Sequence, residues 1–190
     1  MKTKNVMIVG VGGQGSLLAS KILGRLLTEK GFDVKVSEVH GMSQRGGSVV
    51  TYVRYGDKVY SPVIDKGEAD IVIAFELLEA SRYTAFLKDG GAMVVNTQEI
   101  NPMPVITGAA KYPENIEEKI RDLGINLDAM DALSLAEKAG SPKAVNLVLM
   151  GRASKYFGFP KEDWLGVIKK SVPAKYAEMN IKAFELGTEE

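Results

Sequence analysis

Short apolar runs alternate with longer amphipathic segments along the first half of the chain. The apolar runs read KNVMIVG, DVKVSEV, ADIVIAF and GAMVVN, and residues 14–30 and 77–88 carry apolar positions at helical spacing. Continuous apolar strands that alternate with helices are typical of a parallel sheet covered on both faces. The pattern therefore predicts an α/β fold with a mostly parallel sheet and helices on both faces.

The pattern changes after the second apolar run. No crossover helix follows it, and the segment SVVTYVRYGDKVYSPVI instead holds two alternating runs on either side of Gly56 and Asp57. Glycine at the first central position suits a type II′ turn, so these runs predict a β-hairpin insertion after the second strand. Further along, INLDAMDA predicts another strand. Residues 144–158 and 161–186 predict C-terminal helices, the second of them interrupted by Pro173.

A glycine-rich turn joins the first strand to the first helix. The stretch IVGVGGQGS, residues 8–16, places Gly10, Gly12 and Gly15 at this junction. Glycines let a backbone approach a ligand closely, and the N-terminus of the following helix directs free N–H groups at an anion. The turn therefore favours a nucleotide or another phosphate-bearing ligand in a Rossmann-like fold. The alternative is that the glycines only form a tight turn.

A second loop, EVHGMSQRGGSV, gathers small and polar residues beyond the carboxyl end of a strand, where open α/β sheets bind ligands. Arg45 is suited to pairing a phosphate or a carboxylate, and Gly46 and Gly47 let backbone amides converge beside it. A structural cation beside a glycine turn explains the same residues equally well. The only histidine, His40, has no evident catalytic or metal-ligating partners, so no catalytic residue and no metal ligand is predicted.

Composition narrows the function classes. A chain of 190 residues corresponds to about one domain with its own core. It contains no cysteine, which excludes disulfides and thiolate-ligated iron–sulfur clusters. Lys plus Arg and Asp plus Glu number 24 each, so no overall positive charge draws the chain to nucleic acid or to a membrane. No apolar run has the length of a signal peptide or a membrane span, and a cytoplasmic protein is expected.

Together these segments resemble one family, the gamma-type subunits of the 2-oxoacid:ferredoxin oxidoreductases. The resemblance runs over nearly the whole chain, so residues 1–190 are expected to form a single gamma-type domain. It rests on GVGGQGSLLASKILG, EVHGMSQRGGSVVTYVR, SPVIDKGEADIVIAFELLEA, NLVLMG and EMNIKAFELG. The form GMSQRGGS, residues 41–48, is most similar to the branch of the family that acts on indolepyruvate and other arylpyruvates.

The resemblance implies a subunit of an enzyme that oxidatively decarboxylates an aryl 2-oxoacid such as indolepyruvate, with coenzyme A and ferredoxin, to an aryl-acetyl-CoA. In such enzymes thiamine diphosphate, Mg²⁺ and 4Fe-4S clusters supply the chemistry that the protein positions. This chain has no cysteine and no acidic, glycine-rich segment of the kind that holds thiamine diphosphate. These cofactors are therefore expected on a larger alpha subunit, and the chain is not expected to be active alone.

By the same resemblance, coenzyme A is expected to contact this chain between the two glycine loops. The candidate residues are Gly12, Gly13, Gln14, Gly15, Ser43, Gln44, Arg45, Gly46 and Gly47. The C-terminal helices around Trp164 and Phe184 are expected to meet the partner subunit. An isolated chain could form a homodimer through that same surface.

Two other functions remain open on the residues alone. The first is an NAD(P)-dependent oxidoreductase that uses Gly10, Gly12 and Gly15, with Glu38 as the acid that binds ribose. The missing crossover helix after the second strand and the lack of an evident proton-transfer set argue against it. The second is a non-catalytic nucleotide-binding module.

Overall fold

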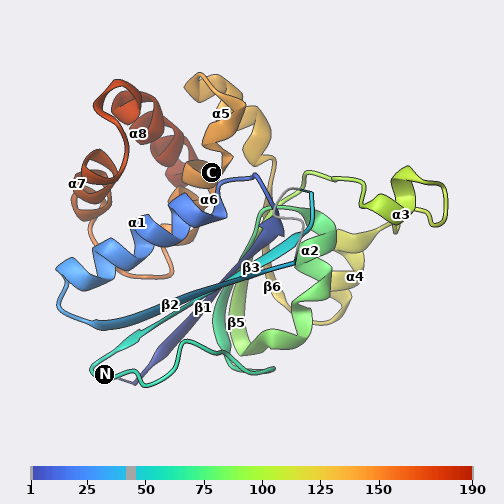
Figure 1. Cartoon of the computed structure of the whole chain (residues 1–190), viewed down its shortest axis with the longest axis horizontal. Helices are drawn as coiled ribbons and strands as arrows, with labels where there is room; N and C mark the ends of the chain where they lie inside the picture. Colours follow the sequence, from blue (N-terminus) through green and yellow to red (C-terminus); the bar gives the residue numbers. More distant parts are fainter. Residues whose placement is uncertain (1, 42–45, 190) are drawn as a thin grey trace.

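The computed structural model describes residues 2–41 and 46–189, which form a six-stranded mixed sheet (Figure 1). The strands are β1 (Lys4–Val11), β2 (Asp33–His40), β3 (Ser48–Gly56), β4 (Ala69–Ala74), β5 (Leu87–Asn96) and β6 (Asn126–Met130), in the order β2-β3-β1-β4-β5-β6. Strand β3 is antiparallel to both of its neighbours, whereas β1, β4, β5 and β6 pair in parallel.

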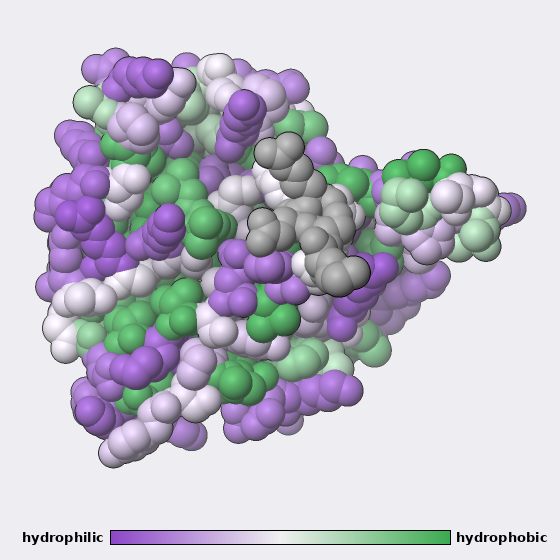
Figure 2. All heavy atoms as spheres, viewed as in Figure 1, coloured by the Kyte–Doolittle hydropathy of each residue, from purple (hydrophilic) through white to green (hydrophobic). Residues whose placement is uncertain are grey.

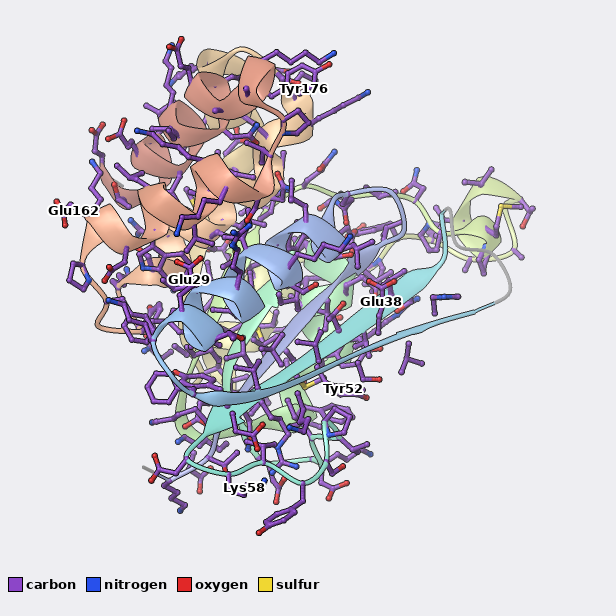
Figure 3. All side chains as sticks on the ribbon, turned by 60° about the vertical axis from the view of Figure 1, so that its left-hand side comes forward. Glu29, Glu38, Tyr52, Lys58, Glu162 and Tyr176 are labelled. Carbon is purple, nitrogen blue, oxygen red and sulfur yellow. The ribbon has the colours of Figure 1, made fainter. Side chains whose placement is uncertain are left out.

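Helices cover both faces of the sheet (Figure 1). One face carries α1 (Ser16–Glu29), α5 (Ala132–Ala139), α6 (Val145–Ser154), α7 (Lys161–Ser171) and α8 (Ala174–Glu189). The other face carries α2 (Leu77–Arg82) and α4 (Ile116–Asp122), and the short α3 (Met103–Ile106) projects from the sheet edge in a long connection. Glu29, the last residue of α1 (Figure 3), accepts a hydrogen bond of 3.0 Å from Lys170 Nζ of α7.

The sequence of the central strand β1 is continuously apolar because both of its faces are buried. Val6 and Ile8 belong to the core under α1 and the C-terminal helices, whereas Met7 and Val9 belong to the core under α2 and α4. All four side chains are fully buried. A strand buried on both faces needs apolar residues at every position rather than at alternate ones.

The α/β class, the helices on both faces and the C-terminal helices are confirmed, including the break between α7 and α8 at Pro173. The strand expected from INLDAMDA is β6. The helix expected over residues 77–88 is shorter, because α2 ends at Arg82 and β5 begins at Leu87.

The expected hairpin about Gly56 is wrong in its pairing. Strand β3 pairs with β2 and β1, and residues 57–68 form no strand. Side chains form hydrogen bonds with backbone groups of residues 57–68 that would have bonded to a neighbouring strand in a hairpin. Arg54 Nη1 donates to the carbonyls of Ser61 and Val63 at 3.1 and 2.7 Å, and Val59 N donates to Asp33 Oδ2 at 2.8 Å. The second apolar run is therefore a loop, and β3 is inserted between β1 and β2.

Helices α6 and α8 pack with their backbones in contact. A Cβ atom added at Gly151 would lie 2.0 Å from the carbonyl oxygen of Phe184, and one added at Gly187 would lie 2.0 Å from that of Val148. Real Cβ atoms do not approach a carbonyl oxygen this closely. Glycine is therefore required at both positions by the approach of the two helices.

Asp128 of β6 joins the sheet to α6. Its carboxylate accepts hydrogen bonds from Arg152 Nε and from Tyr156 OH, and it lies 2.7 Å from Lys155 Nζ. Partial burial by itself raises the pKa of Asp128, but the hydrogen bonds from Lys155 and Arg152 outweigh burial and hold this pKa below its usual value.

Replacing Gly151 with Ala should destabilise the fold, because α6 and α8 must separate to admit the methyl group. Overpacking of this kind costs about 1–3 kcal/mol. The matched control is Gly166→Ala on α7, where an added Cβ meets nothing within 4 Å. This control should stabilise the helix by up to about 1 kcal/mol. Urea unfolding measures both variants, and equal free energies of unfolding for them would contradict the close approach.

Replacing Asp128 with Asn should lower stability at neutral pH and have less effect in acid. A carboxylate whose pKa is lowered by folding stabilises the native state above its unfolded pKa, about 3.9, and this contribution is lost as the pH falls through the folded pKa. The difference in free energy of unfolding between wild type and variant should therefore shrink below about pH 4. The exposed Asp122 of α4 serves as a control, since Asp122→Asn should change the free energy of unfolding at neutral pH by less than about 0.5 kcal/mol.

Candidate functional site

The crevice between the carboxyl ends of β1 and β4 is the topological switch point of the sheet. From β1 the chain passes through α1 to β2 at one edge, and from β4 it passes through α2 to β5 on the other side. Open α/β sheets bind their ligands in the crevice that such a divergence leaves. The glycine turn predicted from the sequence lies here, between β1 and α1.

Three glycines of this turn, Gly10, Gly13 and Gly15, are required for distinct geometric reasons. Gly13 and Gly15 have φ angles of 106° and 90°, which side chains rarely adopt. A Cβ atom at Gly10 would lie 2.8 Å from Phe75 Cβ, and one at Gly15 would lie 2.8 Å from Asn146 Nδ2. Helix α1 begins directly after Gly15 with no side-chain cap and no acidic residue in its first turn. Its partial positive charge is therefore not offset by a carboxylate of its own first turn.

The Gln14 side chain is part of the fold. Its Oε1 accepts from Val11 N at 2.8 Å, and its Nε2 donates to the Phe75 carbonyl at 2.9 Å. Asn96 Nδ2 donates to the same carbonyl at 3.1 Å, and Asn96 Oδ1 accepts from Ala132 N at 3.1 Å. These two side chains form an amide chain that links β1, β4, β5 and α5 across the switch point. A ligand can therefore use the backbone of Gln14 but not its amide group without breaking this chain.

The second predicted loop reaches the first. Gly12 N donates to the Gly47 carbonyl at 2.8 Å, and Gly46 N donates to the Gly12 carbonyl at 3.2 Å. The structure thus brings the candidate residues Gly12, Gly46 and Gly47 together. The other three candidates, Ser43, Gln44 and Arg45, lie outside the described residues.

Two clefts border the paired loops. The larger, of about 570 Å³, lies beside Gly13 and Gly15 and is also lined by Gln98, Lys143 and Asn146. The smaller, of about 220 Å³, lies between Gly46–Gly47 on one side and Ile100–Met103 on the other. A helix N-terminus and a lysine give the larger cleft a preference for anionic groups.

Two buried carboxylates at the start of α2 line the smaller cleft. Glu76 and Glu79 are 1% and 2% exposed. Glu76 accepts from Glu79 N at 2.8 Å, from Ile100 N at 3.0 Å and from Tyr112 OH at 2.5 Å. Burial and the hydrogen bond to Glu76 raise the pKa of Tyr112, so its hydroxyl stays protonated and donates. The sequence interpretation missed both carboxylates, although a glutamate directly after a buried apolar strand is an unusual signal.

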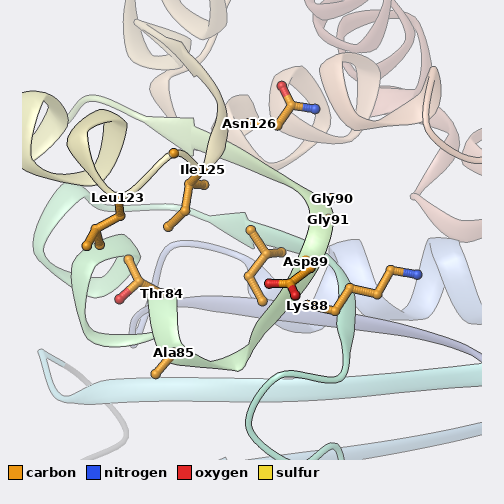
Figure 4. A pocket seen from close by; sticks show the side chains of 11 residues that line it. Thr84, Ala85, Lys88, Asp89, Gly90, Gly91, Leu123, Ile125 and Asn126 are labelled. Carbon is orange, nitrogen blue, oxygen red and sulfur yellow. The ribbon is translucent and has the colours of Figure 1, made fainter.

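Another cavity, of about 490 Å³, lies at the other end of the strands from the glycine loops. Figure 4 shows the side chains that line it. Thr84, Lys88, Asp89, Leu123 and Asn126 are among the residues that line it. It is formed at the amino ends of β5 and β6, away from the glycine loops. It is not part of the switch-point site.

Glu38 does not occupy the place of a ribose-binding acid. In a dinucleotide fold the second strand lies directly beside the first. Here β3 separates β2 from β1, which places Glu38 one strand spacing, about 4.8 Å, farther from β1. Glu38 Oε2 instead accepts a hydrogen bond from Thr51 Oγ1 of β3. The inserted strand therefore argues against the NAD(P) alternative.

Residues 2–41 and 46–189 contain neither a candidate metal centre nor a membrane-spanning helix. No group of three or more His, Cys, Asp or Glu side chains in this part of the chain is arranged to hold a metal ion. No described helix has both the length and the apolarity needed to cross a bilayer.

These features define the class: an open α/β domain with two glycine loops paired at its switch point. The family model described as pyruvate ferredoxin/flavodoxin oxidoreductase matches residues 5–190. The protein named indolepyruvate oxidoreductase subunit IorB in Thermococcus kodakarensis is 45% identical over 192 residues, covering 98% of this chain and 95% of the relative. The protein of that name in Archaeoglobus fulgidus is 41% identical over 187 residues, covering 96% and 92%.

Among solved structures, the pyruvate oxidoreductase subunit PORC of Thermotoga maritima has a TM-score of 0.74 at 23% identity, covering 100% of this chain and 97% of that one. This likeness supports the fold. The chain belongs to the pyruvate ferredoxin/flavodoxin oxidoreductase family. The resemblance found in the sequence motifs is thereby confirmed.

Replacing Gln14 with Met should destabilise the protein, because Val11 N and the Phe75 carbonyl each lose a partner while the volume stays similar. The expected loss is about 1–3 kcal/mol in the free energy of unfolding. Lys21→Met, at an exposed position of α1, is the control and should change stability by less than about 0.5 kcal/mol. Denaturant unfolding gives both values, and similar values would show that the amide chain is dispensable.

Proposed function

We propose that this chain is the small subunit of an indolepyruvate:ferredoxin oxidoreductase that carries no redox cofactor of its own. The observation that carries the proposal is the near full-length similarity, at 45% identity, to a protein named indolepyruvate oxidoreductase subunit IorB. The reaction class follows from the family. The preference for indolepyruvate or other arylpyruvates comes from the relatives' names and from the GMSQRGGS motif.

The proposed reaction cleaves the bond between the carboxylate and the carbonyl carbon of an aryl 2-oxoacid, releasing CO₂. The acyl carbon forms a thioester with coenzyme A, a proton is released, and the two electrons pass to ferredoxin. Thiamine diphosphate with Mg²⁺ and 4Fe-4S clusters supply this chemistry when bound. The absence of cysteine gives this chain no thiolate for a cluster, so we place these cofactors on a larger alpha subunit.

We propose that this chain contributes to the binding of coenzyme A. The larger cleft beside Gly13 and Gly15 offers the N-terminus of α1 and Lys143 to phosphate groups. Gly12, Gly46 and Gly47 let the backbone approach an extended ligand closely. Arg45 belongs to the same loop by sequence, with Ser43 and Gln44, and we assign these residues to the same ligand.

The proposal includes the assembly and its location. We propose that residues 1–190 form one gamma-type domain that docks on the alpha subunit in the cytoplasm. Ferredoxin is the electron acceptor of the whole complex. Homodimers of the isolated chain would use the surface that the alpha subunit covers.

The first test is affinity purification of the tagged chain from its native cells under anaerobic conditions. The expected result is a stoichiometric, cysteine-rich partner that binds thiamine diphosphate, together with ferredoxin reduction that depends on indolepyruvate and coenzyme A. Mass spectrometry and a ferredoxin reduction assay measure the two results. A chain that emerges alone and inactive but retains a nucleotide would contradict the proposal and support a nucleotide-binding module.

Arg45→Ala should raise the apparent KM for coenzyme A in the assembled complex by about tenfold or more. Hydrogen bonds to charged groups contribute about 1.5–3 kcal/mol, and each 1.4 kcal/mol corresponds to a factor of ten. Arg25→Ala is the control, because Arg25 lies on α1 and pairs with Glu29. An unchanged KM for coenzyme A in Arg45→Ala would remove Arg45 from the binding site.

A further inference from the structure

Glu76 and Glu79, at the start of α2, form hydrogen bonds with both sides of the smaller cleft. On one side Ser48 Oγ donates to Glu79 Oε2 at 2.6 Å, and Ser48 directly follows Gly46 and Gly47. Ser48 is also the residue of β3 that pairs with Val11, the last residue of β1. The hydroxyl group of Ser48 thus anchors the described end of the second glycine loop to α2.

On the other side Glu76 anchors the connection that holds α3. Ile100 N and Tyr112 OH both donate to Glu76 Oε1, at 3.0 and 2.5 Å. One carboxylate therefore binds both ends of residues 100–112. Between these ends the connection projects into solvent with Met103 and Ile106 exposed, and Figure 2 shows the apolar surface at its tip.

The two carboxylates are themselves connected. Glu79 N donates to Glu76 Oε2 at 2.8 Å, and Arg82 Nη1 donates to Glu79 Oε1 at 2.5 Å. Burying a carboxylate is costly unless hydrogen bonds and charges compensate. Here part of the compensation comes from Ser48 on one side of the cleft and from Ile100 and Tyr112 on the other. The distance between the two sides therefore depends on the positions of the Glu76 and Glu79 carboxylates.

The described end of the glycine loop is held by backbone hydrogen bonds and by the hydroxyl group of Ser48. Backbone hydrogen bonds between Gly12, Gly46 and Gly47 hold the two loops against each other. A Cβ atom built at Gly46 would meet nothing within 4 Å, so packing does not confine this residue. The hydrogen bond from Ser48 to Glu79 lies immediately beside this exposed segment and ties it to a buried group.

We propose that Glu79, acting through Ser48, is a positioning residue that holds Gly46 and Gly47 against the first glycine loop and thereby sets the affinity for coenzyme A. The proposal rests on the proposed function for its ligand. Neither residue needs to touch the reacting atoms. Their effect is expected in ligand affinity rather than in the rate of the chemical step.

The test compares Ser48→Ala with Ser48→Thr in the assembled complex. Ser48→Ala removes only the hydroxyl group at an exposed position and should raise the apparent KM for coenzyme A about three- to tenfold, with kcat and the KM for the 2-oxoacid unchanged. Ser48→Thr keeps the hydroxyl group and should restore the wild-type KM. The matched control is Ser81→Ala, which removes the hydrogen bond from Ser81 Oγ to the Leu78 carbonyl on the same helix; Leu78 lines the cleft, but Ser81 does not.

Amide hydrogen exchange in the full isolated chain provides a readout that needs no coenzyme A. Ser48→Ala should speed exchange of the Gly12 and Gly46 amides about three- to tenfold, because these donors bridge the two loops. Ser81→Ala and Ser48→Thr should leave both amides at the wild-type rate. These rates report how firmly the loops are held, independently of activity.

The outcomes of these measurements distinguish a failure of the positioning role from a failure of the proposed function. An unchanged KM for coenzyme A in an active Ser48→Ala complex would overturn the positioning role and leave the proposed function intact. Equal increases in Ser48→Ala and Ser81→Ala would overturn it as well, since the effect would then be general loosening of α2. If the wild-type complex shows no activity dependent on coenzyme A, the proposed function fails, and unchanged exchange of the Gly12 and Gly46 amides in Ser48→Ala would then overturn the positioning role on its own.

Discussion

The amide chain across the switch point is the interaction on which the site depends. Strands β1 and β4 are paired up to Val9 and Ala74, and beyond these residues the chain leaves in opposite directions. Backbone groups at such a divergence lose their strand partners and need others. The side chains of Gln14 and Asn96 supply them, both by donating to the Phe75 carbonyl. The crevice therefore stays open at the surface while its base remains fully bonded.

The inserted strand β3 determines what surrounds this base. Because β3 runs antiparallel between β2 and β1, its first residue lies at the carboxyl end of β1. The second glycine loop therefore ends beside the first, and the two exchange backbone hydrogen bonds. The same insertion moves β2, with Glu38, one strand away from the glycine turn. One topological change thus creates the paired loops and removes the arrangement that binds a ribose in dinucleotide enzymes.

The candidate site could be predicted only in part. Gly12 and Gly13 were found because glycine at a strand-to-helix turn has a strong local signal. Gln14 was predicted from the same turn, but its amide bonds to Phe75, a residue 61 positions along the chain, so sequence spacing could not show its role in the fold. Glu76 and Glu79 were missed for the same reason. Their partners Tyr112 and Ser48 are 36 and 31 positions away, and only folding brings them together.

The amino-acid pattern was enough to predict the family, the α/β class, the main helices and strands, and both glycine loops. These features depend on residue type and on short-range periodicity, which are local properties. Only the tertiary structure decided that residues 57–68 form a loop, because Arg54 and Asp33 occupy the backbone groups of Val59, Ser61 and Val63. It also decided that Gly151 and Gly187 are required, since their lack of a side chain matters only where α6 and α8 meet. Contacts between distant segments are set by packing of the whole chain, and no local pattern records them.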